Sequence, residues 1–207
     1  MPHALPRLIA LSSGELRPGD ESTFVEGVAR AFTAGLPAIL LREPALPDRD
    51  YLRLAERLVE LCASAGERWL ALHDRAHLAA ALPVDALHLS FRSLRPSAVR
   101  AWLPARVTLG LSTHAADDPE LWAGADYLFH GPYAPTPKGR FAPPVGLEGM
   151  RAAVEKARAP LLALGGVTPA DVPALLAAGA HGVAVRAGIL AARDPARATR
   201  AYLEAFP

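Results

Sequence analysis

Polar side chains able to do acid–base or anion chemistry follow short apolar runs at several points of the chain. His114 comes directly after Ser112 and Thr113 at the end of one run, and Glu43 follows Arg42 at the end of another. An imidazole titrates near neutral pH, and a carboxylate can carry a proton when its surroundings shift its pKa. We predict His114 as the acid–base residue, Glu43 as a second proton carrier, and Arg42 and Ser112 as substrate-binding residues.

Two glycine-containing turns late in the chain have the composition of phosphate-binding loops. Gly165 and Gly166 follow one apolar run, and Arg186, Ala187 and Gly188 follow the last one. Glycine lets the backbone approach a ligand without a Cβ, and free amides at a helix start favour an anion. We predict backbone phosphate contacts at Gly165, Gly166 and Ala187, with a charged contact from Arg186. Tight turns without any ligand are the alternative.

A further anion contact is predicted in residues 131–146, the longest break between apolar runs. A segment of this length in a small domain is usually functional, so it predicts a lid over the site. Thr136 and Lys138 are its predicted substrate contacts, and Arg140 is a second cation that could close over the ligand. Solvated charges on a surface loop are the alternative.

Eight apolar runs alternate with helical patterns, which is typical of parallel strands joined by helices. The predicted strands are 8–12, 38–42, 69–73, 86–90, 107–112, 127–130, 161–164 and 182–185. The predicted helices are 22–34, 48–65, 75–81, 96–102, 117–123, 147–157, 169–178 and 195–205. We therefore predict one α/β domain over 1–207, a single (β/α)8 TIM barrel with its site at the carboxyl ends of the strands. An open doubly wound sheet is the competing architecture.

The composition favours a small-molecule ligand. The 207 residues carry 22 basic and 21 acidic side chains, a net charge of +1, so no charged footprint for nucleic acid or a membrane surface is expected. No apolar run reaches the ~20 residues of a membrane span, and no signal segment is evident, which predicts a cytoplasmic protein. Cys62 is expected to be a packed thiol. His73 and His77 lack the further ligands that zinc needs, so no metal and no cofactor is predicted.

These residues, in this order, resemble the motifs of the thiamine phosphate synthase and TenI superfamily over nearly the whole chain. The resemblance is carried by Leu41–Glu43, by Gly110–His114, by Gly124–Tyr127 followed by Gly131, Pro132 and Pro135–Lys138, and by Ala163–Gly166 and Gly182–Val185. It implies the barrel and a bound thiazole phosphate.

The chain departs from the synthase pattern in the half that binds the pyrimidine diphosphate. Leu40 and Pro44 stand where the synthase has glutamine and lysine. The resemblance also implies magnesium held by an aspartate after the third strand and an acidic residue after the fourth. Asp74 is retained, but Phe91 and Arg92 follow the fourth strand.

From these departures we predict the TenI branch, a thiazole tautomerase and therefore an isomerase. It would aromatise a carboxythiazole phosphate by proton transfer through His114, and thiazole synthase is a predicted partner. Two alternatives are a thiamine phosphate synthase, which joins hydroxymethylpyrimidine pyrophosphate to thiazole phosphate, and a non-catalytic ligand-binding regulator. The sequence leaves a homo-oligomer open.

Overall fold

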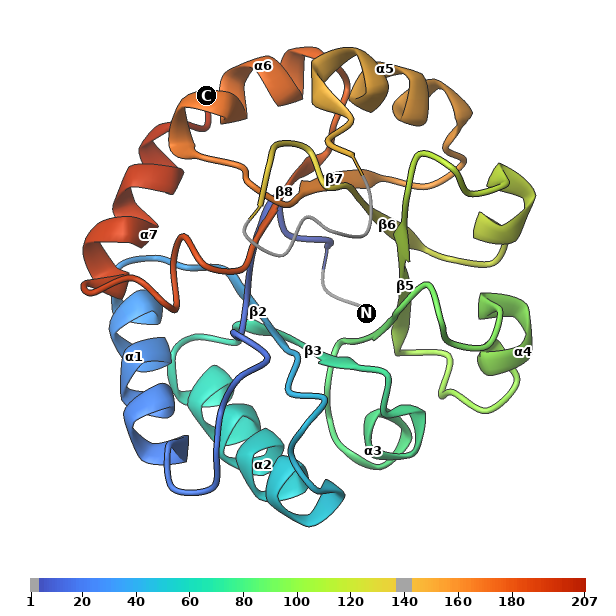
Figure 1. Cartoon of the computed structure of the whole chain (residues 1–207). Helices are drawn as coiled ribbons and strands as arrows, with labels where there is room; N and C mark the ends of the chain where they lie inside the picture. The colour runs from blue at the N-terminus through green and yellow to red at the C-terminus, as the bar shows by residue number, and fades with distance from the viewer. Residues whose placement is uncertain (1–3, 137–142) are drawn as a thin grey trace.

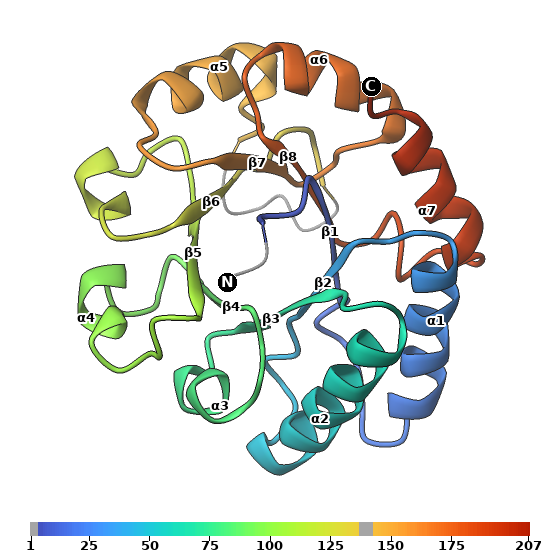
Figure 2. The same ribbon diagram turned by 180° about the vertical axis from the view of Figure 1, so that it is seen from behind.

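The computed structural model describes residues 4–136 and 143–207. Its parallel strands pair in sequence order and β1 also pairs with β8, so the sheet closes into a barrel with the helices outside it (Figures 1 and 2). The predicted (β/α)8 TIM barrel is confirmed. The strands are β1 (Leu8–Leu11), β2 (Ala38–Leu41), β3 (Trp69–His73), β4 (Ala86–Leu89), β5 (Thr108–Thr113), β6 (Tyr127–His130), β7 (Leu161–Leu164) and β8 (Gly182–Val185).

The helices are α1 (Glu21–Thr33), α2 (Asp48–Ser64), α3 (Ala76–Ala81), α4 (Pro96–Arg100), α5 (Gly146–Lys156), α6 (Val172–Ala177) and α7 (Pro195–Glu204), with 3-10 turns η1 (Pro119–Trp122) and η2 (Pro169–Asp171). The helix expected over 117–123 is only η1, and the chain leaves the helical conformation at Ala123, with ψ 135°. The helix expected over 169–178 is split into η2 and α6, since Pro173 has no N–H to continue the hydrogen-bond ladder.

The strands are unbroken apolar runs because both of their faces are buried. In β2, Ala38 and Leu40 pack inside the barrel, while Ile39 and Leu41 pack against the helices. Such two-sided burial is usual in parallel sheets. The same alternation predicts which side chain just beyond each strand points toward the barrel axis.

The helices cover the barrel with one apolar stripe each. In α2 the buried residues are Tyr51, Leu54, Ala55, Leu58 and Cys62, at the spacing of one helix face. Burial raises the pKa of the Cys62 thiol to about 12, so the side chain stays a neutral packed thiol. Among the described residues, no helix has the length and hydropathy that a membrane crossing requires.

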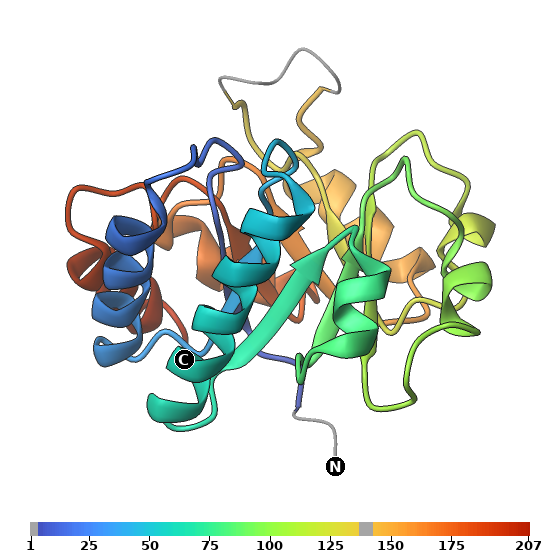
Figure 3. The same ribbon diagram turned by 90° about the horizontal axis from the view of Figure 1, so that it is seen from below.

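Aromatic side chains fill the barrel interior. Trp69 and Tyr127 meet edge to face with ring centroids 5.9 Å apart, and Phe129 lies 5.5 Å from Tyr127. Leu5 packs against this interior cluster from the N-terminal side. Figure 3 shows the chain just before β1, in dark blue, at the rim opposite to the one toward which the strand arrow points.

Gly110 makes room for the bulky interior. A Cβ at this position would overlap the Tyr127 ring and the His88 imidazole. The His88 Nδ1 lies 3.1 Å from the Tyr127 hydroxyl, and its Nε2 lies 2.9 Å from the Ser112 Oγ. The glycine of the Gly110–His114 motif is therefore required by packing in the barrel interior.

Three histidines are buried in their neutral form. Burial lowers the pKa of His73 to about 4 and that of His130 to about 4, and it holds the pKa of His88 well below 6.5. Each has a hydrogen-bonding or ionic neighbour: Asp74 for His73, Tyr127 and Ser112 for His88, and Thr113 for His130. Protonation of these rings would place charge in a low-dielectric interior.

The first prediction compares two glycines. Gly110→Ala is expected to lower the free energy of unfolding by about 1–3 kcal/mol or more, because the new methyl overpacks the interior. Gly27→Ala in α1, where a Cβ would meet nothing within 4 Å, should instead raise it by ~0.5–1 kcal/mol. Urea denaturation followed by circular dichroism measures both. Equal stability of the two variants would contradict this account of the interior.

The second prediction concerns pH. Unfolded histidines titrate near pH 6.5 and these folded ones lower, so the unfolded chain binds more protons between about pH 6.5 and 4. The free energy of unfolding should therefore fall as pH decreases through that window. His130→Asn, whose amide can still donate to Thr113, should reduce the fall in urea titrations at pH 7.5 and 5. His77→Asn, with a side chain 61% exposed, should not. A loss of stability identical in both variants would rule out His130 as a contributor.

Candidate functional site

Two arginines follow strands at the carboxyl-end rim of the barrel, whose opening is called the mouth here. Leu40 of β2 and Ala184 of β8 point inward, so Arg42 and Arg186, two residues further on, continue on the inner side. The two strands flank β1: Leu11 pairs with Leu40, and β8 pairs with β1 on its other side. Both arginines therefore lie at the same rim, one strand apart.

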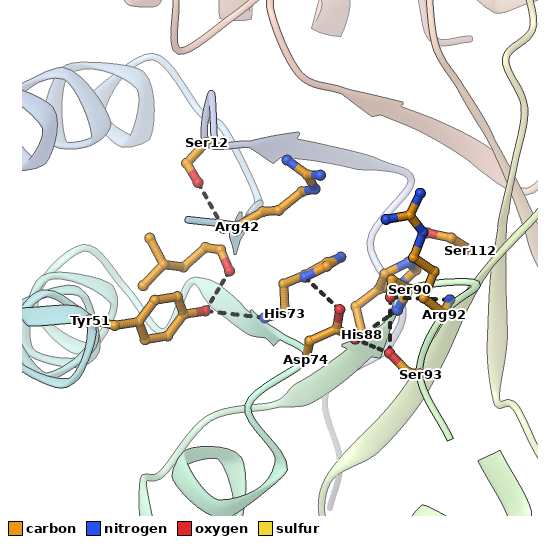
Figure 4. Close-up of polar contacts among 11 residues, drawn as sticks. Ser12, Arg42, Tyr51, His73, Asp74, His88, Ser90, Arg92, Ser93 and Ser112 are labelled. Atoms are coloured by element: carbon orange, nitrogen blue, oxygen red, sulfur yellow. Dashed lines mark hydrogen bonds and ion pairs between the residues drawn. The ribbon is translucent and has the colours of Figure 1, made fainter. Parts of the chain in front are cut away.

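The Arg42 guanidinium lies against the loop between β1 and α1. Gly14 has a φ of 79°, which favours glycine, and a Cβ there would be 2.5 Å from the Arg42 Nη1 and would push the guanidinium aside. The Arg42 backbone N–H donates to the Ser12 Oγ at 2.7 Å. Burial lowers the pKa of Arg42, and the charge of Arg186 lowers it further. Figure 4 shows the Arg42 side chain extending away from β2.

Glu43 is buried, with only 1% of its surface exposed, and holds the same loop. Its Oε1 accepts the Gly14 N–H and its Oε2 accepts the Leu16 N–H, each at 2.9 Å. Both carboxylate oxygens thus fix the loop that supports Arg42. The predicted role of Glu43 as a proton carrier stays a prediction, and the contacts add an anchoring role. The sequence signal for this contact is Gly14, which directly follows Ser12 and Ser13.

Asp74 ties the end of β3 to the end of β4. Its Oδ1 accepts the Ser90 N–H at 2.8 Å and a short hydrogen bond from the Ser93 hydroxyl, and its Oδ2 lies 3.3 Å from the His73 Nδ1 (Figure 4). Its backbone is in the left-handed region, with φ 57°. The Asp74 carboxylate therefore holds the ends of β3 and β4 together through contacts with Ser90, Ser93 and His73.

The magnesium that the resemblance implies does not fit these residues. The Asp74 Oδ1 already accepts two protein hydrogen bonds and its Oδ2 faces the His73 ring, while the β4 end supplies Phe91 and Arg92 where a second carboxylate is implied. Arg92 is exposed and its guanidinium lies 5.1 Å from the Phe91 ring centroid. No group of three or more metal-ligating His, Cys, Asp or Glu side chains occurs in the part of the chain that the structure describes.

His114 and Ser112 line the β5 side of the mouth. The His114 backbone N–H donates to the Asp117 Oδ2 at 2.7 Å, and the Phe91 ring meets the imidazole edge-on at 4.9 Å. The imidazole is 29% exposed, so a ligand in the mouth can reach it. The Ser112 hydroxyl contacts the buried His88 and is thereby fixed in orientation.

The turn after β7 is shaped by the loop that follows β6. The Tyr133 N–H donates to the Leu164 carbonyl and the Ala134 N–H to the Gly165 carbonyl, each at 2.9 Å. Gly165 and Gly166 have φ of 92° and 70°, and a Cβ on Gly166 would lie 2.8 Å from the Ala134 carbonyl oxygen. These glycines are therefore required by the turn, and their predicted phosphate contacts stay a prediction.

Of the predicted contacts in the β6–α5 connection, Thr136 is placed by the structure. Its Cγ2 would be 3.7 Å from a Cβ on Gly165, which puts Thr136 at the β7 turn. Lys138 and Arg140 lie outside the described residues. The predicted lid therefore stays a prediction.

The turn after β8 differs from the expected helix start. Residues 186–191 form turns, and α7 begins only at Pro195, so no helix dipole acts at Arg186. Ala187 and Gly188 are exposed at this turn. A Cβ on Gly188 would lie 2.5 Å from the Tyr202 hydroxyl, which itself donates to the Val167 carbonyl. An anion here would meet backbone amides of a turn, and the predicted charged contact from Arg186 stays a prediction.

Comparison with known proteins shows that the chain is similar to thiamine-phosphate synthases. A family model described as thiamine monophosphate synthase matches residues 10–189. A thiamine-phosphate synthase from Salinispora arenicola is 44% identical over 162 residues, which cover 77% of this chain and 77% of that protein. One from Moorella thermoacetica is 35% identical over 183 residues, 87% of each. The structure of a thiamine phosphate pyrophosphorylase from Pyrococcus furiosus superposes with a TM-score of 0.81 at 27% identity, covering 96% of this chain and 94% of that one.

The comparisons overturn the predicted thiazole tautomerase and its isomerase class. The relatives are named as synthases, which are transferases, and not as members of the TenI branch. The tautomerase prediction rests on Leu40, Pro44 and the Phe91–Arg92 pair, which differ from the synthase pattern. It assumes that each difference removes a contact to the pyrimidine diphosphate. These departures do not by themselves assign the chain to the TenI branch, and Arg186 places a further cation near Arg42. The chain belongs to the thiamine monophosphate synthase family.

Proposed function

We propose that this chain is a thiamine-phosphate synthase, a transferase that joins hydroxymethylpyrimidine pyrophosphate to thiazole phosphate. The observation that carries the proposal is the mouth itself, where a half-buried Arg42 lies at the same rim as the glycine turns after β7 and β8. The reaction has two phosphorylated substrates and needs two anion subsites. The names and the 44% identity of the relatives support the same assignment.

The proposed reaction is a substitution at the methylene carbon of the pyrimidine. The ring nitrogen of the thiazole donates its electron pair to this carbon, and the bond between the carbon and the diphosphate oxygen breaks. The diphosphate leaves with that electron pair, so negative charge develops on it. Arg42 is desolvated and fixed by the β1–α1 loop, which makes it suited to stabilise the leaving charge.

The other predicted site residues take roles in holding the substrates. We assign the thiazole phosphate to the turns at Gly165, Gly166 and Ala187, close to Thr136, because a ligand there can meet backbone amides. The attacking nitrogen carries no proton, so the reaction asks for no base at the thiazole. His114 then serves as a wall of the mouth that orients the rings.

The third prediction is the reaction itself. Purified protein incubated with hydroxymethylpyrimidine pyrophosphate, thiazole phosphate and magnesium chloride should form thiamine phosphate and release one pyrophosphate for each product, as measured by mass spectrometry and a pyrophosphate assay. Binding of both substrates without any new carbon–nitrogen product would contradict the proposal and favour the non-catalytic ligand-binding alternative.

The fourth prediction tests the support of Arg42 with two loop glycines. Gly14→Ala should lower kcat/KM about 10-fold or more, since its methyl displaces the Arg42 guanidinium. Gly19→Ala is the matched control: it lies in the same loop at φ 102°, and a Cβ there would meet nothing within 4 Å. Both variants carry similar backbone strain. Equal activity in the two would mean that the position of Arg42 does not matter for the reaction.

A further inference from the structure

We propose that the guanidinium groups of Arg42 and Arg186 neutralise the substrate's diphosphate in this chain and take the place of the divalent cation. The identity of the diphosphate rests on the proposed function. The presence of a two-arginine anion site does not, because it can be tested with inorganic pyrophosphate alone.

The residues at the ends of β3 and β4 do not favour a bound divalent cation. Magnesium in phosphate sites is usually held by one or two carboxylates, with waters and substrate oxygens completing its shell. Asp74 gives its Oδ1 to the Ser90 N–H and the Ser93 hydroxyl, and its Oδ2 faces the His73 Nδ1 at 3.3 Å. These contacts turn Asp74 into a link between β3 and β4. Arg92 adds positive charge at the β4 end, where a second carboxylate would be needed.

The arginine side supplies the missing charge. Two guanidinium groups carry the same charge as one divalent cation, and each presents a planar fork of N–H donors that matches phosphate oxygens. Arg42 follows β2 and Arg186 follows β8, the two strands that flank β1. Both residues lie two positions beyond a side chain that points into the barrel. Two like charges held at one rim repel each other, so an anion between them is favoured.

The positions of both side chains are set by the fold. Arg42 is supported by Gly14 beneath its guanidinium and by Glu43, which pins the Gly14 and Leu16 amides. The lowered pKa of Arg42, from burial and then from Arg186, agrees with a cation that is partly stripped of water and faces another cation. A desolvated cation binds an anion more strongly than one in bulk water.

In the proposed reaction this pair acts on the leaving group. As the bond between the methylene carbon and the diphosphate oxygen breaks, the electron pair moves to that oxygen, and the two guanidinium groups hold the charge that develops. The released diphosphate then carries the charge into solution with its own counterions. No oxidant, reductant or further co-reactant is required.

The fifth prediction uses calorimetry with inorganic pyrophosphate in buffer containing EDTA. The wild-type protein should bind, and Arg186→Ser should weaken the affinity about 10- to 100-fold, the usual effect of losing a charged hydrogen-bonding partner. Arg186→Lys, which keeps the charge but loses the fork, should be intermediate. Replacing EDTA by magnesium chloride should leave the wild-type affinity unchanged or lower, because magnesium neutralises pyrophosphate in solution.

The matched control is Arg158→Ser, which makes the same charge change at a side chain that is 85% exposed and precedes β7 at the opposite rim. It should bind pyrophosphate like the wild type. Circular dichroism establishes that each variant is folded. Absence of binding in EDTA with strong binding in magnesium would overturn the proposal, as would equal losses in Arg186→Ser and Arg158→Ser.

The same measurements separate this proposal from the proposed function. Pyrophosphate binding that depends on Arg186 in a protein that makes no thiamine phosphate would support the arginine site and refute the synthase assignment. Thiamine phosphate formation that stops on addition of EDTA, with no binding of pyrophosphate under those conditions, would support the synthase and refute the arginine site.

Discussion

The alternation of side chains along very short strands is the constraint on which the rest of this structure depends. Most of the strands span four residues, so each one offers two side chains to the barrel axis and two to the helices. The inward positions are filled mainly by apolar and aromatic groups, with His88 of β4 as a buried polar member. The next inward position along each strand, beyond the packed interior, belongs to the mouth, and Arg42 and Arg186 occupy it on the two sides of β1.

Most polar groups at the rim hydrogen-bond to loops of the protein itself. Only a few polar side chains there remain for a ligand. Glu43 pins the β1–α1 loop, Asp74 links β3 to β4, and the β6–α5 loop hydrogen-bonds along the end of β7. Each of these contacts uses up donors or acceptors that sequence reasoning would offer to a substrate. Arg42 keeps its guanidinium directed into the mouth, which makes it the centre of the proposed transferase site.

Charge explains how departures from the family pattern can coexist with the proposed transferase reaction. Lysine and acidic positions of the synthase pattern are occupied here by Pro44 and by Phe91 and Arg92. Taken one by one, these changes suggest a lost diphosphate site. Taken together with Arg186 at the same rim, they fit the proposed anion site whose cations are side chains, because guanidinium groups can neutralise a phosphate as a metal does.

The sequence by itself determined the barrel, because strands buried on both faces must be written as apolar runs and the helices between them as amphipathic ones. It also placed Arg42, His114 and the glycine turns at the rim, since they follow those runs. Only the tertiary structure decided that both oxygens of Glu43 bind backbone amides, that Asp74 is already occupied, and that no helix starts at Arg186. The physical reason is that hydrogen-bond partners come from residues distant in sequence, and the pattern of one strand does not contain the loop of another.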